Sequence, residues 1–306
     1  MVTSIDSIGI IGFGEVGAII GQDLVAQGVR VVAFDRLIED PERRAALQEK
    51  ARTCGVILVE SLERAIDNVP LIISAVTAGC ALEVARSVAA RRPQGQLFMD
   101  INSVSPRTKL LASEAIEDCG GNYIDAAVMA PVPLQRLKTP ILLGGTQAPA
   151  LADALQLLGF NARAFSDKVG AASAVKMCRS VMIKGLEALT TECLAAARQY
   201  GVEQPVLESL HKSFPSMGWD ANRPHYLISR VAEHGRRRAE EMIEVAKTVE
   251  DVGIPARMSE AIAVVQAGWV DAMDEAEIQY TDKEPFDWRS LVDALYGKHV
   301  DPQRKP

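Results

Sequence analysis

The chain has 306 residues, of which 48% are hydrophobic and 24% are charged, and its formal net charge is −7. This composition is typical of a folded globular protein, and at this length two domains are expected because a single hydrophobic core stops growing. The acidic balance and the lack of a long basic run argue against a nucleic-acid partner.

Cysteine and histidine usage narrows the chemistry further. The five cysteines are scattered and odd in number, with no Cys-x-x-Cys pair, and none of the four histidines forms His-x-x-x-His. This pattern favours free thiols in a reducing compartment and predicts no metal site. The N-terminus has no basic leader, and charged residues interrupt the apolar stretch 171–197. We therefore expect no signal peptide and no membrane partner, and we predict a cytoplasmic protein.

The first predicted strand, residues 8–11, leads directly into a glycine-rich turn and a predicted helix over 15–26. In the pattern Gly-x-Gly-x-x-Gly, the first glycine allows a tight turn, the second lets a pyrophosphate approach the backbone, and the third lets the helix pack on the strand. The pyrophosphate would then sit at the positive end of the helix. The predicted cofactor contacts are Gly12, Phe13, Gly14, Glu15, Val16 and Gly17.

A second predicted strand, residues 29–34, ends at Asp35. An acidic residue about 20 positions after the glycines is suited to bind the adenosine ribose, and its charge would repel a 2′-phosphate. This favours NAD. The next residue, Arg36, could instead neutralise that phosphate, so NADP remains an alternative.

Strands and helices alternate through the first part of the chain. The pattern predicts helices over 41–53, 61–68, 79–91 and 106–118, and strands over 56–59, 71–76, 96–100 and 123–128. Such alternation predicts an α/β, Rossmann-type doubly wound sheet with ligands at the carboxyl ends of the strands. Val76, Thr77, Asn102 and Ser103 follow two of those ends. We take Val76, Thr77 and Asn102 as cofactor contacts, and Asn102 and Ser103 as substrate contacts.

The pattern changes after residue 166. A proline-bearing loop (130–140), a strand (141–145), a helix (149–159) and a strand (162–165) precede a proline-free helix over about 168–200, whose length would be about 45 Å. Only helical patterns follow. We therefore predict a dinucleotide-binding domain over 1–166 and an all-helical substrate and oligomerisation domain over 167–306.

Four segments occur in the order found in a known family: 9–17, 99–106, 123–128 with 142–145, and 170–180. They resemble the β-hydroxyacid dehydrogenases, which include 3-hydroxyisobutyrate dehydrogenase and 6-phosphogluconate dehydrogenase. Two features depart from the family: Met129-Ala130-Pro131 stands where Ser-Gly-Gly is usual, and Arg179 and Ser180 replace two asparagines. The C-terminal region is similar to a branch whose C-terminal domain has no assigned function.

The resemblance implies hydride transfer between a nicotinamide and the hydroxyl carbon of a small hydroxy acid or its oxo form, with Lys176 as general acid/base. A lysine releases its proton more readily when it is desolvated or lies beside another cation. Arg179 lies one turn further along the predicted helix, on the same face. We expect Arg179, Ser180 and Arg237 to bind the substrate, the arginines through its anionic group.

Two other functions remain open. One is imine reduction on the same fold, although related imine reductases typically carry a different polar residue at the position of Lys176. The other is a nucleotide-binding protein that has lost catalysis. The absence of the family's Ser-Gly-Gly and Asn-Asn residues is consistent with this alternative. A homodimer or higher homo-oligomer is expected because the helical domain would otherwise expose apolar surface.

Overall fold

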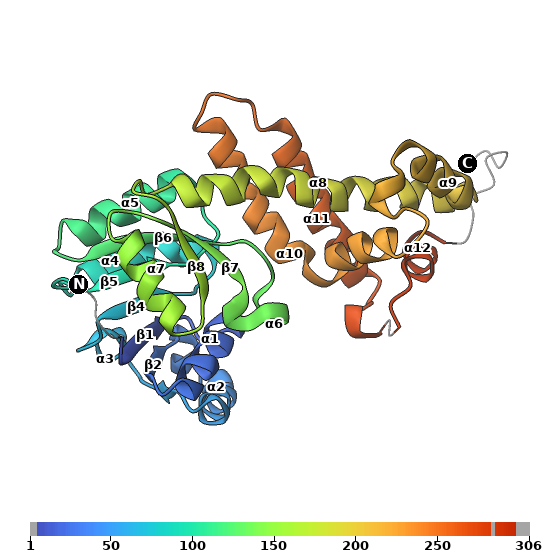
Figure 1. The fold of residues 1–306 in the computed structure, drawn as a ribbon. Helices are drawn as coiled ribbons and strands as arrows, with labels where there is room; N and C mark the ends of the chain where they lie inside the picture. The colour runs from blue at the N-terminus through green and yellow to red at the C-terminus, as the bar shows by residue number, and fades with distance from the viewer. Residues whose placement is uncertain (1–4, 283–284, 298–306) are drawn as a thin grey trace. The chain divides into compact units, whose positions relative to one another are not determined.

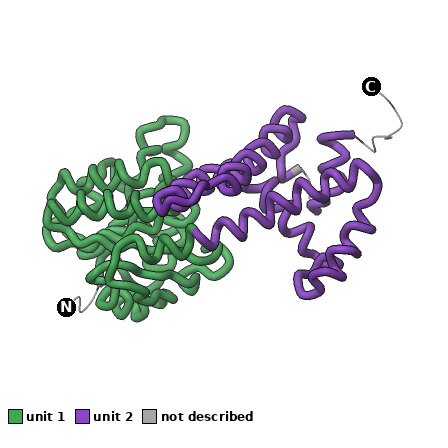
Figure 2. The backbone as a smooth tube through the Cα atoms, turned by 90° about the horizontal axis from the view of Figure 1, so that it is seen from above, with its two compact units in different colours: residues 1–177 green, residues 178–306 purple. Residues whose placement is uncertain are grey.

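The computed structural model describes residues 5–282 and 285–297. The chain divides into two compact units, with the boundary between Met177 and Cys178 (Figure 2). The last strand ends at Ser166, where the sequence pattern changes from α/β to helical, and the boundary lies eleven residues later, inside the long helix α8 (Ala171–Gln199).

The first unit is built on one eight-stranded sheet in the order β3-β2-β1-β4-β5-β6-β7-β8 (Figure 1). Neighbouring strands are parallel throughout, except that β6 and β7 are antiparallel. The strand order reverses between β1 and β4, which is where such sheets bind ligands. The strands are β1 (Ser7–Ile11), β2 (Arg30–Phe34), β3 (Ile57–Leu58), β4 (Leu71–Ser74), β5 (Leu97–Asp100), β6 (Asn122–Val128), β7 (Pro140–Gly144) and β8 (Asn161–Ser166).

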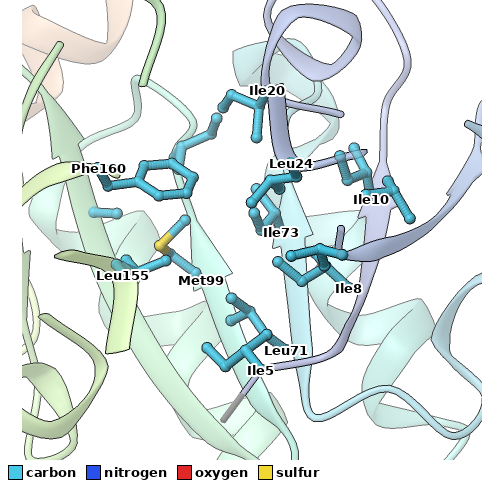
Figure 3. Close-up of a cluster of buried hydrophobic side chains, with 14 of the residues drawn as sticks. Ile5, Ile8, Ile10, Ile20, Leu24, Leu71, Ile73, Met99, Leu155 and Phe160 are labelled. Atoms are coloured by element: carbon cyan, nitrogen blue, oxygen red, sulfur yellow. The ribbon is translucent and has the colours of Figure 1, made fainter. Parts of the chain in front are cut away.

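Helices cover both faces of the sheet because successive strand residues point to opposite sides. Figure 3 shows one core, in which Ile8, Ile73 and Met99 from the strands meet Leu24 and Leu155 from the helices. A second core lies on the other face. Helices α1 (Glu15–Ala26), α2 (Pro41–Cys54) and α7 (Ala148–Leu157) contribute to the first core, and α3 (Leu62–Ile66), α4 (Ala81–Ala89) and α5 (Pro106–Glu117) to the second. The predicted doubly wound α/β fold is confirmed.

The segment between β6 and β7, predicted as a loop, contains the short helix α6 (Val132–Gln135) and a 3₁₀ turn over Arg136–Lys138. Prolines are tolerated in a first helical turn, so proline content alone did not exclude a helix here. Arg136 connects this segment to α1, because its Nε and Nη2 donate to Asp23 Oδ1 at 2.9 and 2.6 Å. This contact joins residues 113 positions apart and is not visible in the local sequence.

A buried polar network joins the sheet to the start of α8. Asp125, at 0% exposure on β6, accepts hydrogen bonds from the backbone N–H groups of Gly170 (3.1 Å) and Ser173 (3.0 Å) through Oδ2. The first turn of a helix has N–H groups with no intrahelical partner, and here a carboxylate from the sheet satisfies two of them.

The charge of this carboxylate is balanced by Lys109, which is also fully buried. Lys109 Nζ lies 3.6 Å from Asp125 Oδ1 and 3.1 Å from Asp100 Oδ1, and it donates to the Asp100 backbone carbonyl at 2.6 Å. Tyr123 donates its hydroxyl to Asp100 Oδ2 at 2.7 Å. Burial, followed by the charge of Asp100, raises the pKa of Tyr123 well above its usual value, so the phenol stays protonated.

The second unit is helical over its described residues apart from connecting turns. It contains the greater part of α8, then α9 (Glu203–Ser213), α10 (Arg223–Glu250), α11 (Arg257–Glu275) and α12 (Trp288–Tyr296). Leu194, Ile228, Val231, Trp269 and Trp288 contribute to its apolar core. Among the described residues, no helix combines the length and the apolar character needed to cross a membrane.

Replacing Lys109 with methionine should destabilise the protein strongly. The substitution leaves Asp100 and Asp125 buried without their cation, and breaking a buried ion pair on one side costs about 3–5 kcal/mol. Urea unfolding measures the loss. Lys138→Met, at an exposed position, is the matched control and should change the free energy of unfolding by no more than about 0.5 kcal/mol. Equal stability of the two variants would contradict the prediction.

Candidate functional site

The three glycines of the loop after β1 have different environments. Gly12 has a φ of +91°, and a Cβ there would overlap the carbonyl oxygen of Ala75. A Cβ at Gly17 would overlap the carbonyl oxygen of Gly12. Because glycine has no Cβ, α1 can approach the loop this closely. At Gly14, the N-cap of α1, a Cβ would meet nothing within 4 Å. Two glycines therefore allow close packing, and the third leaves the backbone open to a ligand.

The glycine loop is an arrangement that fits a dinucleotide pyrophosphate. Gly14 and Glu15 are exposed at the first turn of α1, Val16 is half-buried, and Phe13 is buried beneath them. The N–H groups of a helix start carry partial positive charge and bind phosphate oxygens.

Asp35 lies beside this loop and supports it. Its Oδ2 accepts from the Phe13 backbone N–H at 2.8 Å, and its Oδ1 accepts from the Leu37 N–H at 3.0 Å. Arg36, the next residue, is exposed. Lys50 on α2 donates to the Phe13 carbonyl at 3.5 Å, so a second cation lies at the loop. The sequence interpretation missed Lys50 because it is one of many charges on a surface helix and its position depends on tertiary packing.

The loops that follow β4 and β5 are connected through Asn102. Its Oδ1 accepts from the Val76 backbone N–H at 2.7 Å, and its Nδ2 donates to the Ser74 hydroxyl at 2.9 Å. Its own N–H donates to Asp100 Oδ1 at 2.8 Å. Thr77, next to Val76, is exposed. Asn102 is only 5% exposed, so its observed contacts position the two loops at the carboxyl edge of the sheet.

Lys176 and Ser103 are 73 positions apart in the sequence and lie side by side in the structure. The Lys176 ammonium donates to the Ser103 hydroxyl, with an Nζ–Oγ distance of 2.6 Å. Lys176 is half-buried and lies one turn after Ser173 on α8. Asp125 fixes the start of α8 through its hydrogen bonds with Gly170 and Ser173. The helix so placed directs Lys176 toward Ser103.

The other three predicted substrate residues belong to the second unit. Arg179 is exposed. Ser180 is buried, and its hydroxyl accepts from Lys184 Nζ at 3.3 Å. Arg237 is exposed and pairs with Glu241, with an Nη1–Oε1 distance of 2.8 Å. Ser180 and Arg237 thus have partners within the helical unit.

The run 236–238 does not form a single basic face. Arg236 pairs with Asp271 and Asp274 on the surface, whereas Arg238 is 9% exposed and pairs with the buried Glu187 at 2.8 Å. Consecutive helix residues point about 100° apart, so neighbouring arginines reach different partners.

Glu187 belongs to a buried polar cluster that the sequence interpretation did not identify. Gln266 donates to its Oε2 at 3.4 Å, and Lys184, one turn before it, pairs with Glu241 at 2.9 Å. Burial raises the pKa of Glu187, and the charge of Arg238 opposes this increase. Burial and the nearby arginines also lower the pKa of His234 to about 4, so its imidazole is neutral at pH 7.

Over residues 5–282 and 285–297, no group of three or more His, Cys, Asp or Glu side chains could hold a metal ion. All five cysteines are free thiols.

Comparison with known proteins identifies two family models in the chain. Residues 7–169 match the NAD binding domain of 6-phosphogluconate dehydrogenase, and residues 197–269 match a domain of unknown function. The first match covers the glycine loop, Asp35, Asn102 and Ser103.

Similar proteins extend over most of the chain. A solved conserved hypothetical protein from Sinorhizobium meliloti is 36% identical over 96% of both chains, with a TM-score of 0.74. A conserved protein of unknown function, described as structurally similar to 3-hydroxyacid dehydrogenases, is 35% identical over 86% of this chain and 96% of its own, with a TM-score of 0.68. Human mitochondrial 3-hydroxyisobutyrate dehydrogenase is 21% identical over 72% of this chain and 66% of its own length.

The glycine loop yields a matched pair of substitutions. Gly14→Ala should leave stability unchanged, because a Cβ there meets nothing within 4 Å, but should weaken NAD(H) binding by blocking close approach of the pyrophosphate. Gly17→Ala should cost about 1–3 kcal/mol of stability through overpacking against the loop. Urea unfolding and calorimetric titration with NADH separate the two effects. A loss of stability in Gly14→Ala as large as that in Gly17→Ala would contradict this division of roles.

Proposed function

Because this chain belongs to the family defined by the NAD binding domain of 6-phosphogluconate dehydrogenase, we propose that it is an NAD(P)-dependent dehydrogenase or reductase of a small hydroxy acid. Lys176 is its general acid/base. The observation that carries the proposal is the 2.6 Å hydrogen bond from Lys176 Nζ to Ser103 Oγ. It brings a proton-transferring group and a hydroxyl together after β5, at the edge of the sheet where ligands bind.

In the proposed reaction a hydroxy acid becomes its oxo acid. A bound nicotinamide supplies the hydride acceptor, or the donor in the reverse direction. Lys176, in its neutral form, accepts the proton from the substrate hydroxyl as the carbonyl forms, and returns it during reduction. Ser103 orients that hydroxyl by hydrogen bonding to it and to the lysine. The helix start held by Asp125 keeps Lys176 at a fixed position for both directions.

Binding of the substrate's carboxylate is assigned to Arg179. A guanidinium can form two parallel hydrogen bonds with a carboxylate. Arg179 is exposed one turn beyond Lys176 on the same helix, whereas Arg237 is engaged by Glu241 and Ser180 by Lys184. With Met129-Ala130-Pro131 in place of the family's glycines, a side-chain cation has to replace the backbone N–H groups that glycines would expose.

The cofactor-binding residues are proposed from the same geometry. Gly12, Phe13, Gly14, Glu15, Val16 and Gly17 surround the pyrophosphate, and Val76 and Thr77 face the cofactor from the loop after β4. Asp35 binds the adenosine ribose and disfavours a 2′-phosphate, which supports NAD as the preferred cofactor.

Replacing Lys176 with alanine should lower kcat by about 10²–10⁴-fold, the usual contribution of a general acid/base. NADH affinity should remain unchanged, because the proposal gives Lys176 a part in proton transfer and none in holding the cofactor. Steady-state kinetics over a panel of small hydroxy acids, with NADH titration beside it, provides the measurement. Ser103→Ala should reduce kcat less, since it removes the orienting hydroxyl and retains the base. An unchanged kcat in Lys176→Ala would exclude the assigned role.

The same panel separates the competing functions. It should include cyclic imines and ketone–amine mixtures alongside the hydroxy acids, each with NAD(H) and NADP(H). Turnover of hydroxy acids supports the proposal, and turnover of imines alone would replace it with imine reduction. Tight NADH binding with no turnover of either class would leave a non-catalytic nucleotide-binding protein.

Arg36→Ala should distinguish the two nicotinamide cofactors. If NAD is preferred, its KM should change less than twofold on removal of this exposed cation. The KM for NADP should rise several-fold, because the cation next to Asp35 that could offset the 2′-phosphate is lost. A rise in the KM for NAD with an unchanged KM for NADP would contradict the assignment.

A further inference from the structure

The segment that leaves β6 at the carboxyl edge of the sheet carries no polar side chain. After Asp125, the nine residues 126–134 are Ala-Ala-Val-Met-Ala-Pro-Val-Pro-Leu. The loop after β5 is different, because Asn102 and Ser103 supply an amide and a hydroxyl there. β5 and β6 are parallel neighbours in which Asp100 lies level with Asp125. A polar and an apolar segment therefore leave adjacent strands at the same edge of the sheet.

One residue of the apolar segment, Met129, packs against the beginning of α8. The pairing of β6 with β7 extends to this residue, whose N–H donates to the Pro140 carbonyl at 2.9 Å. Because alternate residues of a strand point to the same face, Asp125, Ala127 and Met129 are directed to one side of the sheet. Asp125 accepts hydrogen bonds from the start of α8 on that side. Ala127 and Met129 pack there in a small apolar cluster with Ala172 of α8.

This cluster lies next to the lysine of the proposed site. Ala172 and Lys176 are four residues apart on α8, so their side chains are neighbours on one face of the helix. Lys176 Nζ donates to Ser103 Oγ at 2.6 Å. Met129 is half-buried, so part of its side chain remains accessible. Lys176 therefore has the hydroxyl of Ser103 on one side and the apolar cluster of Met129 on another.

We propose that Met129 is a specificity residue, which forms an apolar wall of the substrate site and selects hydroxy acids that carry an alkyl group. The proposal rests on the proposed function, because it takes Lys176 and Ser103 as the place of reaction. A hydroxyl or phosphate group held against this wall would lose its hydrogen bonds with water and find no polar side chain within 126–134. An alkyl group avoids this cost, and the flexible thioether of methionine adapts to its shape.

Binding of unreactive carboxylates to the NADH complex tests the wall without turnover. In calorimetric titrations, affinity should increase from acetate through butanoate to hexanoate by about fourfold for each added methylene. Gluconate has the same number of carbons as hexanoate but carries five hydroxyls, and it should bind at least tenfold more weakly. A series with no dependence on chain length would overturn the proposal. So would tighter binding of gluconate than of hexanoate, or no binding of any of these acids.

Substitution of Met129 tests whether this residue provides the selectivity. Met129→Gln keeps the length of the side chain and replaces the thioether with an amide, so it should reduce the increase to less than twofold per methylene. Met129→Leu, which remains apolar at similar volume, should retain the increase. Leu157→Gln, at an 83% exposed position on α7, is the matched control and should also retain it.

Circular dichroism melting establishes that each variant is folded. If Met129→Gln does not fold, Met129→Ser replaces it, since serine removes the apolar chain without adding volume. An undiminished dependence on chain length in the folded polar variant would assign the selectivity to other residues and overturn the proposal.

Steady-state kinetics separates this inference from the proposed function. Hydroxy acids with alkyl chains of four to six carbons should have a higher kcat/KM than glycerate and gluconate. Turnover of glycerate and gluconate alone would overturn the apolar wall and leave the dehydrogenase function standing. A preference for alkyl carboxylates in the titrations, with no turnover of any hydroxy acid, would uphold the wall and reject the dehydrogenase function.

Discussion

The rest of the candidate site depends on one buried carboxylate. Asp125 lies on β6, and its side chain accepts hydrogen bonds from the N–H groups of Gly170 and Ser173 at the start of α8. This deeply buried charge is stabilised by those two N–H groups and by the cation of Lys109, which also pairs with Asp100. The strands therefore determine where the long helix begins and which face it turns toward the loop after β5. Lys176 meets Ser103 as a consequence of this anchor.

The loops at the carboxyl edge of the sheet are held in place by two different physical constraints. The glycine loop is shaped by steric limits, since Gly12 and Gly17 leave no room for a side chain. The adjoining loops are shaped by hydrogen bonds, with Asn102 joining the segments after β4 and β5. Close packing thus fixes one loop of this edge, and side-chain hydrogen bonds fix the loops beside it.

The local features of this fold were predictable from sequence. The glycine loop, the alternation of strands with helices and the extent of α8 all follow from short-range patterns, and the structure confirms the fold that they imply. The contacts of Lys109, Arg136 and Arg238 were not predictable, because each depends on partners in elements far along the chain. The sequence pattern suggested that the arginines at 236–238 act together, whereas in α10 their side chains point in different directions and reach different partners. The roles of Lys176, Arg179 and Asp35 in catalysis and binding remain predictions.

The contacts of Asp35 have a consequence for cofactor engineering. Its two carboxylate oxygens accept hydrogen bonds from Phe13 in the glycine loop and from Leu37 after β2. A designer who replaces this aspartate to admit a 2′-phosphate therefore also removes one hydrogen bond that supports the glycine loop and one that supports the turn after β2. Under the proposed assignment of Asp35, selectivity between the nicotinamide cofactors and rigidity of the loop are thus properties of the same side chain. A change of preference has to be made from neighbouring positions such as Arg36 and Lys50, which leave those hydrogen bonds in place.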